Sequence, residues 1–150
     1  MSNQPSPSQF AATDGLAASM SDLFALIARL FIGWLFLTSG WTKLMNTAGT
    51  VGYLTNLGVP SPDLMVWLVL GSELLLGVTL ILGLATRYAA LYGVLFVVIA
   101  TAIAHRYWAY PAAQQTLQYT MLIKNLAIIG GLLLLFVGSA GRYSVDAKMR

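Results

Sequence analysis

The sequence predicts an all-α, polytopic membrane protein in which four transmembrane helices form a bundle. Two observations lead to this fold class. Hydrophobic residues make up 58% of the 150-residue chain and charged residues only 9%, whereas roughly 25% of the residues in a soluble domain are charged. In addition, four separate apolar segments each approach the roughly 20 residues that a helix needs to cross a bilayer.

The four predicted spans cover residues 22–44, 64–84, 88–104 and 117–137. Because the bilayer core cannot hydrogen-bond to the backbone, each span must be a helix or a strand of a closed barrel. The segments are too long and too continuously apolar for barrel strands, whose apolar residues alternate. Buried helices of a soluble protein are excluded as well, because too little chain is left to cover them.

Local signals place the ends of these helices. Ser21 or Asp22 can cap the first helix, and Ser61-Pro62-Asp63 is a strong start signal for the second. Residues 85–87 form a tight link, which predicts that the second and third helices are an antiparallel hairpin.

The longer first link carries apolar residues between two glycines, at positions 51, 53, 54 and 57. It is either a short helix in the membrane interface or an apolar loop.

The two ends of the chain are expected to lie outside the membrane domain, which is assigned to residues 21–146. Residues 1–20 are rich in Ser, Gln, Pro and Ala and contain no Lys or Arg. This composition predicts a disordered N-terminal tail and lacks the basic region that begins a signal peptide. Residues 147–150 are assigned to a C-terminal tail.

The distribution of Lys and Arg predicts the orientation of the bundle in the membrane. Arginines and lysines near the span ends favour the cytoplasmic side. One side of the bundle holds four of them and the other holds two; these are Arg87, Arg142, Lys148 and Arg150 against Lys43 and Arg106. Both termini are therefore predicted to be cytoplasmic, which places Lys43 on the outer side of the membrane.

Composition also limits the chemistry. The chain has no cysteine, which excludes disulfide relays, iron–sulfur clusters and thiolate metal sites, and no metal site is expected. The net charge of +3 comes without any basic run, so nucleic acid is not an expected partner. No covalently bound cofactor is expected, and redox chemistry would need a diffusible cofactor such as a quinone, or a partner protein.

Glu73 is the most informative residue of the sequence. It lies about ten positions into the second span, roughly 15 Å deep at 1.5 Å per residue, near the middle of a core about 30 Å thick. A charge at that depth must face protein, find a partner or be protonated. Lys124 of the fourth span lies at a similar depth and is predicted to pair with it. The pair is either a functional site, with Glu73 handling protons, or a buried ion pair that fixes helix register.

Two further cations lie on one stripe of the first span. Arg29 and Lys43 share a helical face with Gly33, Phe36 and Gly40. Lys43 lies at the outer end and is expected near Glu73. Arg29 lies in the inner half, where it either has a buried role or extends to the cytoplasmic surface.

A polar cluster is predicted in the outer half of the bundle. His105 and Arg106 end the third span, where a histidine is more often an interfacial hydrogen-bonding residue than a ligand or a base. Asn125, next to Lys124, adds a hydrogen-bonding group. Four cationic groups around one carboxylate would suit an anion or a polar quinone head group.

Several short segments resemble the DoxX family of small bacterial membrane proteins over residues 23–146. They are Arg29-Leu-Phe-Ile-Gly33, Ser39-Gly40-Trp-Thr-Lys43, Leu57-Gly58-Val59-Pro60, Glu73, His105-Arg-Tyr-Trp108, Lys124-Asn125-Leu-Ala and Gly141-Arg-Tyr-Ser144-Val-Asp146. The resemblance implies a four-helix membrane bundle in a bacterial inner membrane. It also implies association with redox enzymes, since the family is named after a membrane subunit of a thiosulfate:quinone oxidoreductase.

Two functions are therefore expected. The first is a membrane subunit of an oxidoreductase system that binds a quinone or a small anion at the outer polar cluster, with Glu73 as the proton-handling group and Lys43, His105, Arg106, Lys124 and Asn125 as ligand-binding residues. The second is a non-catalytic membrane scaffold or assembly factor, whose buried charges only lock the bundle. Either function implies a partner protein or a homo-oligomer in the bilayer.

Overall fold

The computed structural model describes residues 8–149, which are helical apart from short links and contain no strand. The elements are α1 (Ser8–Met45), α2 (Thr47–Asn56), α3 (Pro62–Leu82), α4 (Thr86–Ala104), a 3-10 turn η1 (Tyr107–Ala109), α5 (Ala112–Gly138) and α6 (Val145–Lys148). Within this part of the chain, α1, α3, α4 and α5 are long and apolar enough to cross a membrane. The predicted all-α bundle of four spans is confirmed.

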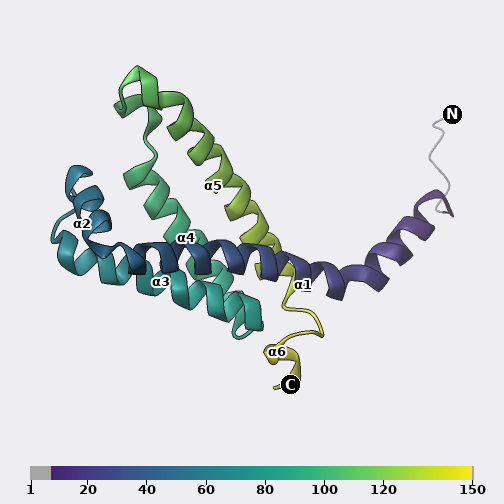
Figure 1. The fold of residues 1–150 in the computed structure, drawn as a ribbon. Helices are drawn as coiled ribbons and strands as arrows, with labels where there is room; N and C mark the ends of the chain where they lie inside the picture. Colours follow the sequence, from purple (N-terminus) through teal and green to yellow (C-terminus); the bar gives the residue numbers. More distant parts are fainter. Residues whose placement is uncertain (1–7, 150) are drawn as a thin grey trace, which may run out of the picture.

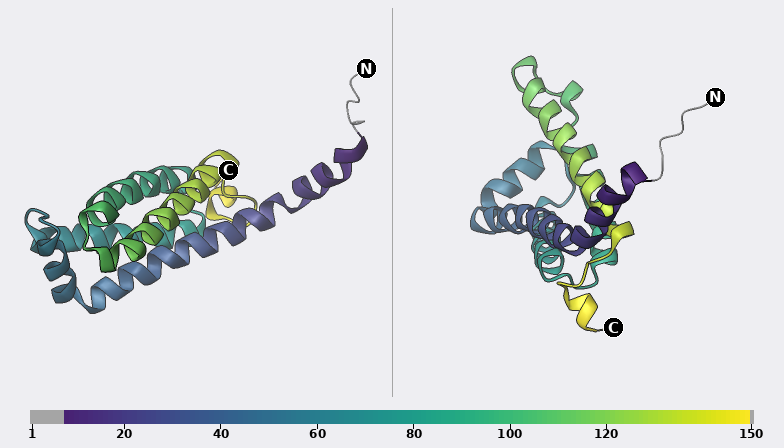
Figure 2. Two further views of the ribbon diagram at one scale, coloured as in Figure 1. Left: turned by 90° about the horizontal axis from the view of Figure 1, so that it is seen from above. Right: turned by 90° about the vertical axis from the view of Figure 1, so that its right-hand side faces the viewer.

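The four spans pack as two pairs (Figures 1 and 2). Helices α1 and α3 lie side by side along most of the length of α3, and α4 and α5 form a hairpin. The pairs meet at the end of the bundle that carries α6 and diverge toward the end that carries α2 and η1. We call these the α6 end and the α2 end. The bundle is therefore closed at one end and splayed at the other.

Glycine allows α1 and α3 to approach closely. A Cβ atom at Gly77 of α3 would lie 2.7 Å from the backbone nitrogen of Leu37, and one at Gly33 of α1 would lie 2.7 Å from a side-chain carbon of Ile81. Small residues at such contacts are typical of membrane helices, whose association depends on close packing. These two glycines thus keep α1 and α3 paired through the middle of the bundle.

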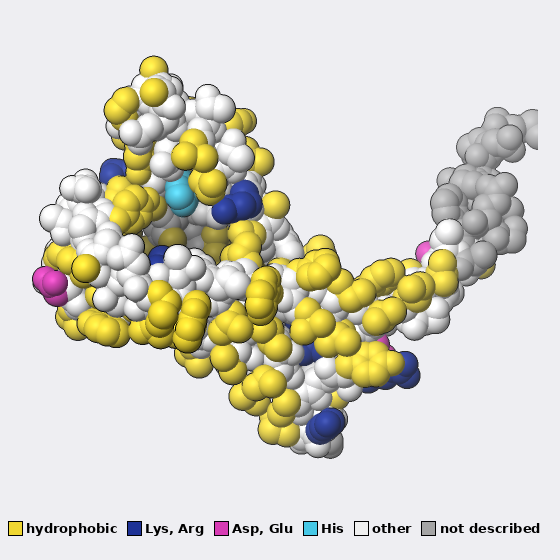
Figure 3. All heavy atoms as spheres, in the orientation of Figure 1, with side chains coloured by type: hydrophobic (Ala, Val, Ile, Leu, Met, Phe, Trp, Pro, Cys, Tyr) yellow, Lys and Arg dark blue, Asp and Glu magenta, His cyan; other side chains and the backbone are white. Residues whose placement is uncertain are grey.

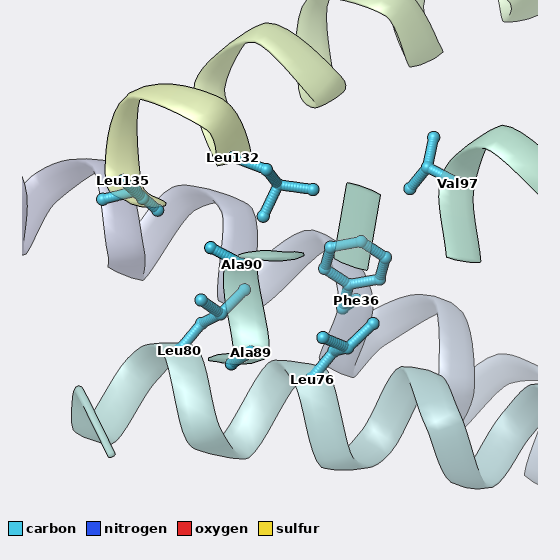
Figure 4. Packing of buried hydrophobic residues seen from close by; sticks show 8 residues of the cluster. All are labelled: Phe36, Leu76, Leu80, Ala89, Ala90, Val97, Leu132 and Leu135. Atoms are coloured by element: carbon cyan, nitrogen blue, oxygen red, sulfur yellow. The ribbon is translucent and has the colours of Figure 1, made fainter. Parts of the chain in front are cut away.

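The apolar core joins the two pairs near the α6 end (Figure 4). It consists of eight buried residues from all four spans: Phe36, Leu76, Leu80, Ala89, Ala90, Val97, Leu132 and Leu135. Many other large apolar side chains are exposed (Figure 3), as expected for helices whose outer surface faces lipid. Interior packing therefore determines how the two pairs meet, and lipid covers the exposed apolar side chains.

The first link contains the short helix α2, as one of the two interpretations predicted. Asn46 caps it, because its side chain accepts a hydrogen bond from the amide of Gly49 at 3.0 Å. Leu54 of α2 packs against Val66 and Leu70 at the start of α3. Helix α2 is thus fastened to the α2 end of the α1–α3 pair, and the alternative of an apolar loop is wrong.

Two predicted details of the next links are wrong. Ser61 makes no side-chain capping bond, because its backbone is left-handed, although Pro62 does stand in the first turn of α3. The tight link is residues 83–85 instead of 85–87, since α3 ends at Leu82 and α4 begins at Thr86. Gly83, with a φ of 67°, ends α3 in a left-handed cap.

The predicted disordered tail is wrong for residues 8–20, which form the beginning of α1, while residues 1–7 lie outside the described part. This stretch contains four alanines, which favour helix. Helix α1 therefore runs through Ser21 and Asp22 without a cap at either residue. Its side chains that the structure describes from Ala11 to Ser19 are exposed. Helix α1 thus extends beyond the packed part of the bundle at its N-terminal end (Figure 1).

The predicted C-terminal tail also begins too early. Residues 145–148 form α6, in which Ser144 caps the helix by accepting a bond from the amide of Ala147 at 3.2 Å. Residues 139–148 fold across the α6 end and contact α1 and the α3–α4 link. We call this segment the C-terminal clasp.

Candidate functional site

Lys43 and Glu73 form a buried ion pair between α1 and α3. The ammonium of Lys43 lies 2.9 and 2.8 Å from the two carboxylate oxygens of Glu73. Ser39, one turn earlier on α1, accepts a bond from Lys43 at 2.7 Å and donates one to Glu73 at 3.1 Å. The side chains are 27% and 9% exposed. The three side chains therefore satisfy one another's hydrogen bonds, and the charges of Lys43 and Glu73 balance.

Local sequence explains this geometry. Lys43 follows Ser39 by four residues and therefore projects from the same face of α1. Gly40 lies between them, and a Cβ atom there would meet Leu74 at 2.9 Å. The absence of a side chain at Gly40 lets the α3 backbone approach, which brings Glu73 within reach of both polar groups.

The predicted pair of Glu73 with Lys124 is wrong. The ammonium of Lys124 makes one polar contact among the described residues, to Sδ of Met121 at 3.3 Å, and the residue is exposed. The prediction compared depths counted from the ends of the spans, but α5 begins at Ala112, five residues earlier than expected. In addition, α5 diverges from α3 toward the α2 end, which separates Lys124 from Glu73 and cannot be inferred from the sequence.

Two polar pairs connect α4 and α5 in the splayed half. The ring Nδ1 of His105 lies 2.8 Å from Oε1 of Gln118, and Asn125 donates to the hydroxyl of Thr101 at 2.8 Å. His105 thus acts as a hydrogen-bonding residue at the helix end, which was the favoured interpretation. Gln118 was missed by the sequence analysis, although its polar side chain in an otherwise apolar span was a visible signal.

The lateral hollow is the space left where the two pairs diverge. Figure 3 shows that the molecular surface is hollowed between the α4–α5 hairpin and the elements α1 and α2, with basic and histidine side chains around it. Arg106 is exposed and contributes to a cavity of about 200 Å³ with residues 57–60, Ala102 and Ile103. The predicted polar residues do not form one bonded cluster. Lys43 pairs with Glu73, whereas His105 and Asn125 bond to residues of the α4–α5 hairpin.

Tyr53 and Tyr110 lie close to each other at the α2 end. Burial, the proximity of Tyr110 and a hydrogen bond between the two side chains raise the pKa of Tyr53 to about 12. Tyr53 belongs to α2, whereas Tyr110 follows η1 and donates to the carbonyl of Ala104 at 2.9 Å.

Arg29 has a buried role, and extension to the membrane surface is wrong. It is 0% exposed. Nη1 donates to the carbonyls of Leu80 and Ile81 at 3.4 and 3.3 Å, and Nη2 donates to that of Tyr143 at 2.5 Å. The first two carbonyls belong to the last turn of α3, where a cation is favourable. Arg29 therefore joins α1, α3 and the C-terminal clasp and lies far from the lateral hollow.

The clasp makes further charged contacts that the sequence analysis missed. Asp146 accepts bonds from the amides of Ala85 and Thr86 at 2.6 and 2.8 Å, which caps α4. Asp22 accepts a bond from the backbone amide of Arg142 at 2.9 Å. Gly83 is required beneath the clasp, since a Cβ atom there would collide with the guanidinium of Arg29. The DoxX-like residues 141–146 therefore have structural roles in the clasp.

Metal ligands are not gathered in this part of the molecule. Within residues 8–149, no three His, Cys, Asp or Glu side chains lie close enough together to hold a metal ion.

The comparisons with known proteins agree with this architecture. A sequence profile of the DoxX family matches residues 24–106. Inner membrane protein YqjF of Escherichia coli is 35% identical over 85% of this chain and 92% of its own length. Inner membrane protein YphA of the same organism is 30% identical over 82% of this chain and 88% of its own length.

A more distant relative carries a functional name. The Bacillus subtilis protein named "Putative oxidoreductase CatD" is 33% identical over 50% of this chain and 52% of its own length. No solved structure matches the chain at a significant level. The family match, the two long alignments and the four spans together show that this chain is a membrane protein of the DoxX family.

Proposed function

We propose that this chain is the membrane subunit of an oxidoreductase system and binds a quinone head group or a small anion in the lateral hollow. The observation that supports the proposal most directly is the excess of positive charge there. Glu73 neutralises Lys43, whereas Lys124 and Arg106 form no ion pair within residues 8–149. The relative named as an oxidoreductase adds support.

Each polar residue has a role in this proposal. Lys124 and Arg106 supply positive charge, and His105 and Asn125 offer hydrogen bonds beside them. The pair of Lys43 and Glu73 forms the opposite wall, where Glu73 would exchange protons with the ligand. The chain has no cysteine and one histidine, so electrons would come from a partner protein and not from a centre of its own.

Ligand binding by the purified protein tests the proposal. The protein would be extracted in a mild detergent, and co-purified quinones, lipids and proteins would be identified by mass spectrometry. Calorimetry would then measure binding of a short-chain quinone, of sulfate and of phosphate. Lys124→Gln should weaken binding of the active probe by about tenfold. Arg87→Gln is the matched control, because Arg87 is exposed near the start of α4 at the α6 end.

The proposal fails if no quinone and no anion binds, or if Lys124→Gln binds as tightly as the wild type. Binding of the quinone alone or of the anions alone would decide between the two ligand classes.

A second function, that of a non-catalytic scaffold or assembly factor, is favoured by a different observation. Both oxygens of Glu73 are already bonded to Lys43, and one of them also to Ser39. The charge of Glu73 is therefore neutralised within the bundle. A double variant, Lys43→Met with Glu73→Leu, separates the two functions. A partner complex that keeps its activity with this variant would support the scaffold, and loss of activity with normal assembly would support the site.

A further inference from the structure

Lys124 lies on the face of α5 that is turned toward α1. The direction of its face is given by Gly131 on the same helix, where a Cβ atom would lie 3.0 Å from Cδ1 of Ile32 in α1. Lys124 precedes Gly131 by seven residues, or about two helical turns, and therefore lies on the same face of α5. At Gly131 the two helices touch. At Lys124 they have separated, so the lysine borders the lateral hollow.

Lys43 borders the same hollow from the other side. It follows Ile32 by eleven residues, or about three turns, so both lie on one face of α1. Because its side chain is 27% exposed, Lys43 is accessible there while it pairs with Glu73. The hollow therefore has a lysine on each of its two facing helices, of which only the one on α1 is neutralised.

No acid of the described chain can neutralise Lys124. The chain has five acidic residues. Glu73 pairs with Lys43, while Asp22 and Asp146 are engaged at the α6 end. Asp14 is exposed in the unpacked start of α1, and Asp63 is exposed in the first turn of α3. A charged lysine within a span is unfavourable unless a counter-charge lies nearby, so a counter-charge from outside the chain is expected.

The surroundings of Lys124 favour an amphiphilic counter-ion over a free one. Leu117 lies on the same face, two turns nearer the α2 end, and is 56% exposed. Helix α5 is the least buried of the four spans. Because α5 diverges from α1 toward the α2 end, the hollow is open along the side between these two helices (Figure 3). A ligand entering from that side comes from the lipid phase.

We infer that the lateral hollow holds the anionic phosphate head group of a phospholipid, which pairs with Lys124 while its acyl chains lie along the exposed apolar face of α5. The inference rests on the proposed function, because it names the anion of the same site. It adds that the ligand arrives through the opening between α1 and α5.

Titrations with three probes test the inference, with native mass spectrometry as the readout. The probes are short-chain phosphatidylglycerol, phosphatidylcholine with the same acyl chains, and inorganic phosphate. Wild-type protein should bind phosphatidylglycerol about tenfold more tightly than phosphatidylcholine. Lys124→Gln should abolish this preference, Lys124→Arg should keep it, and Arg87→Gln should leave it unchanged. Circular dichroism would verify that each variant is folded.

The other outcomes separate this inference from the proposed function. If phosphate binds as tightly as phosphatidylglycerol and depends on Lys124, the anion site stands and the lipid is wrong. If only a quinone binds, the proposed function stands and the inference fails. A preference for phosphatidylglycerol that persists in Lys124→Gln places the lipid elsewhere and overturns the inference. If no probe and no quinone binds, both fail.

Discussion

Lys43 of α1 and Glu73 of α3 neutralise each other inside the membrane domain, at 2.8 and 2.9 Å, with Ser39 bonded to both. The pair belongs to the most extensive helix contact of the bundle, where Gly40 removes the side chain that would keep the helices apart. The pair therefore has a structural role, and this role can be measured separately from the proposed ligand binding.

A double-mutant cycle should show strong coupling between Lys43 and Glu73. Removing one partner of a buried pair leaves an uncompensated charge and typically lowers the free energy of unfolding by about 3–5 kcal/mol, whereas removing both can be nearly neutral. Lys43→Met and Glu73→Leu should each destabilise the protein, and the double variant should recover most of the loss. Lys124→Met combined with Glu73→Leu is the control and should be additive. Additive effects for the first pair would contradict the pairing.

Arg29 should tolerate no simple replacement. Its guanidinium donates to three carbonyls from two segments, and a lysine ammonium lacks the planar fork needed to reach all of them. Arg29→Met should lower the thermal unfolding temperature and expose the C-terminal clasp to proteases. Arg29→Lys should recover part of the loss at most. Arg87→Met, at an exposed position, serves as the reference, and equal stability of both methionine variants would refute the assigned role.

Asp146 should act as the cap of α4. Asp146→Ala removes both acceptors for the amides of Ala85 and Thr86, and the loss of such a cap typically lowers stability by about 0.5–2 kcal/mol. Hydrogen exchange at these two amides should accelerate much more than exchange in the middle of α4. Asp146→Asn keeps one side-chain oxygen and should have an intermediate effect. Unchanged exchange in the alanine variant would exclude the cap.

Deletion of residues 2–18 should leave the membrane domain intact. The side chains described between Ala11 and Ala18 are all exposed, so their removal deletes no core contact. Membrane insertion and the thermal unfolding temperature should stay within the error of the wild type. A deletion extended through residue 22 would also remove the Asp22 contact to Arg142 and should destabilise the clasp. A large loss of folded protein from the shorter deletion would contradict this assignment.

The orientation predicted from Lys and Arg places both termini in the cytoplasm. A phosphatase that is active only outside the cytoplasm, fused after residue 150, should therefore show no activity. The same enzyme inserted in the link between α4 and α5, at residue 111, should be active. The reverse pattern would overturn the orientation and would place the lateral hollow in the inner leaflet.

Sequence periodicity and length predicted the four spans because hydropathy is a property of each segment alone. Helix α2 was predicted as one of two alternatives. Which polar residues pair could not be predicted, since Glu73 had two lysines at suitable depths and the choice depends on how the helices diverge. Gly40 was the discriminating signal, because its small size allows α3 to approach the helix that carries Lys43. The role of Asp146 depends on a contact with α4 from 60 residues away, which no local pattern reveals.

The C-terminal clasp has a consequence for biosynthesis. Residues 139–148 leave the ribosome after all four spans, and a chain interrupted before residue 139 would still insert four helices into the bilayer. Such a chain would lack the cap of α4 and the Tyr143 acceptor for Arg29, so its α6 end would open more readily. Copies with and without the clasp therefore differ in local stability at one membrane face.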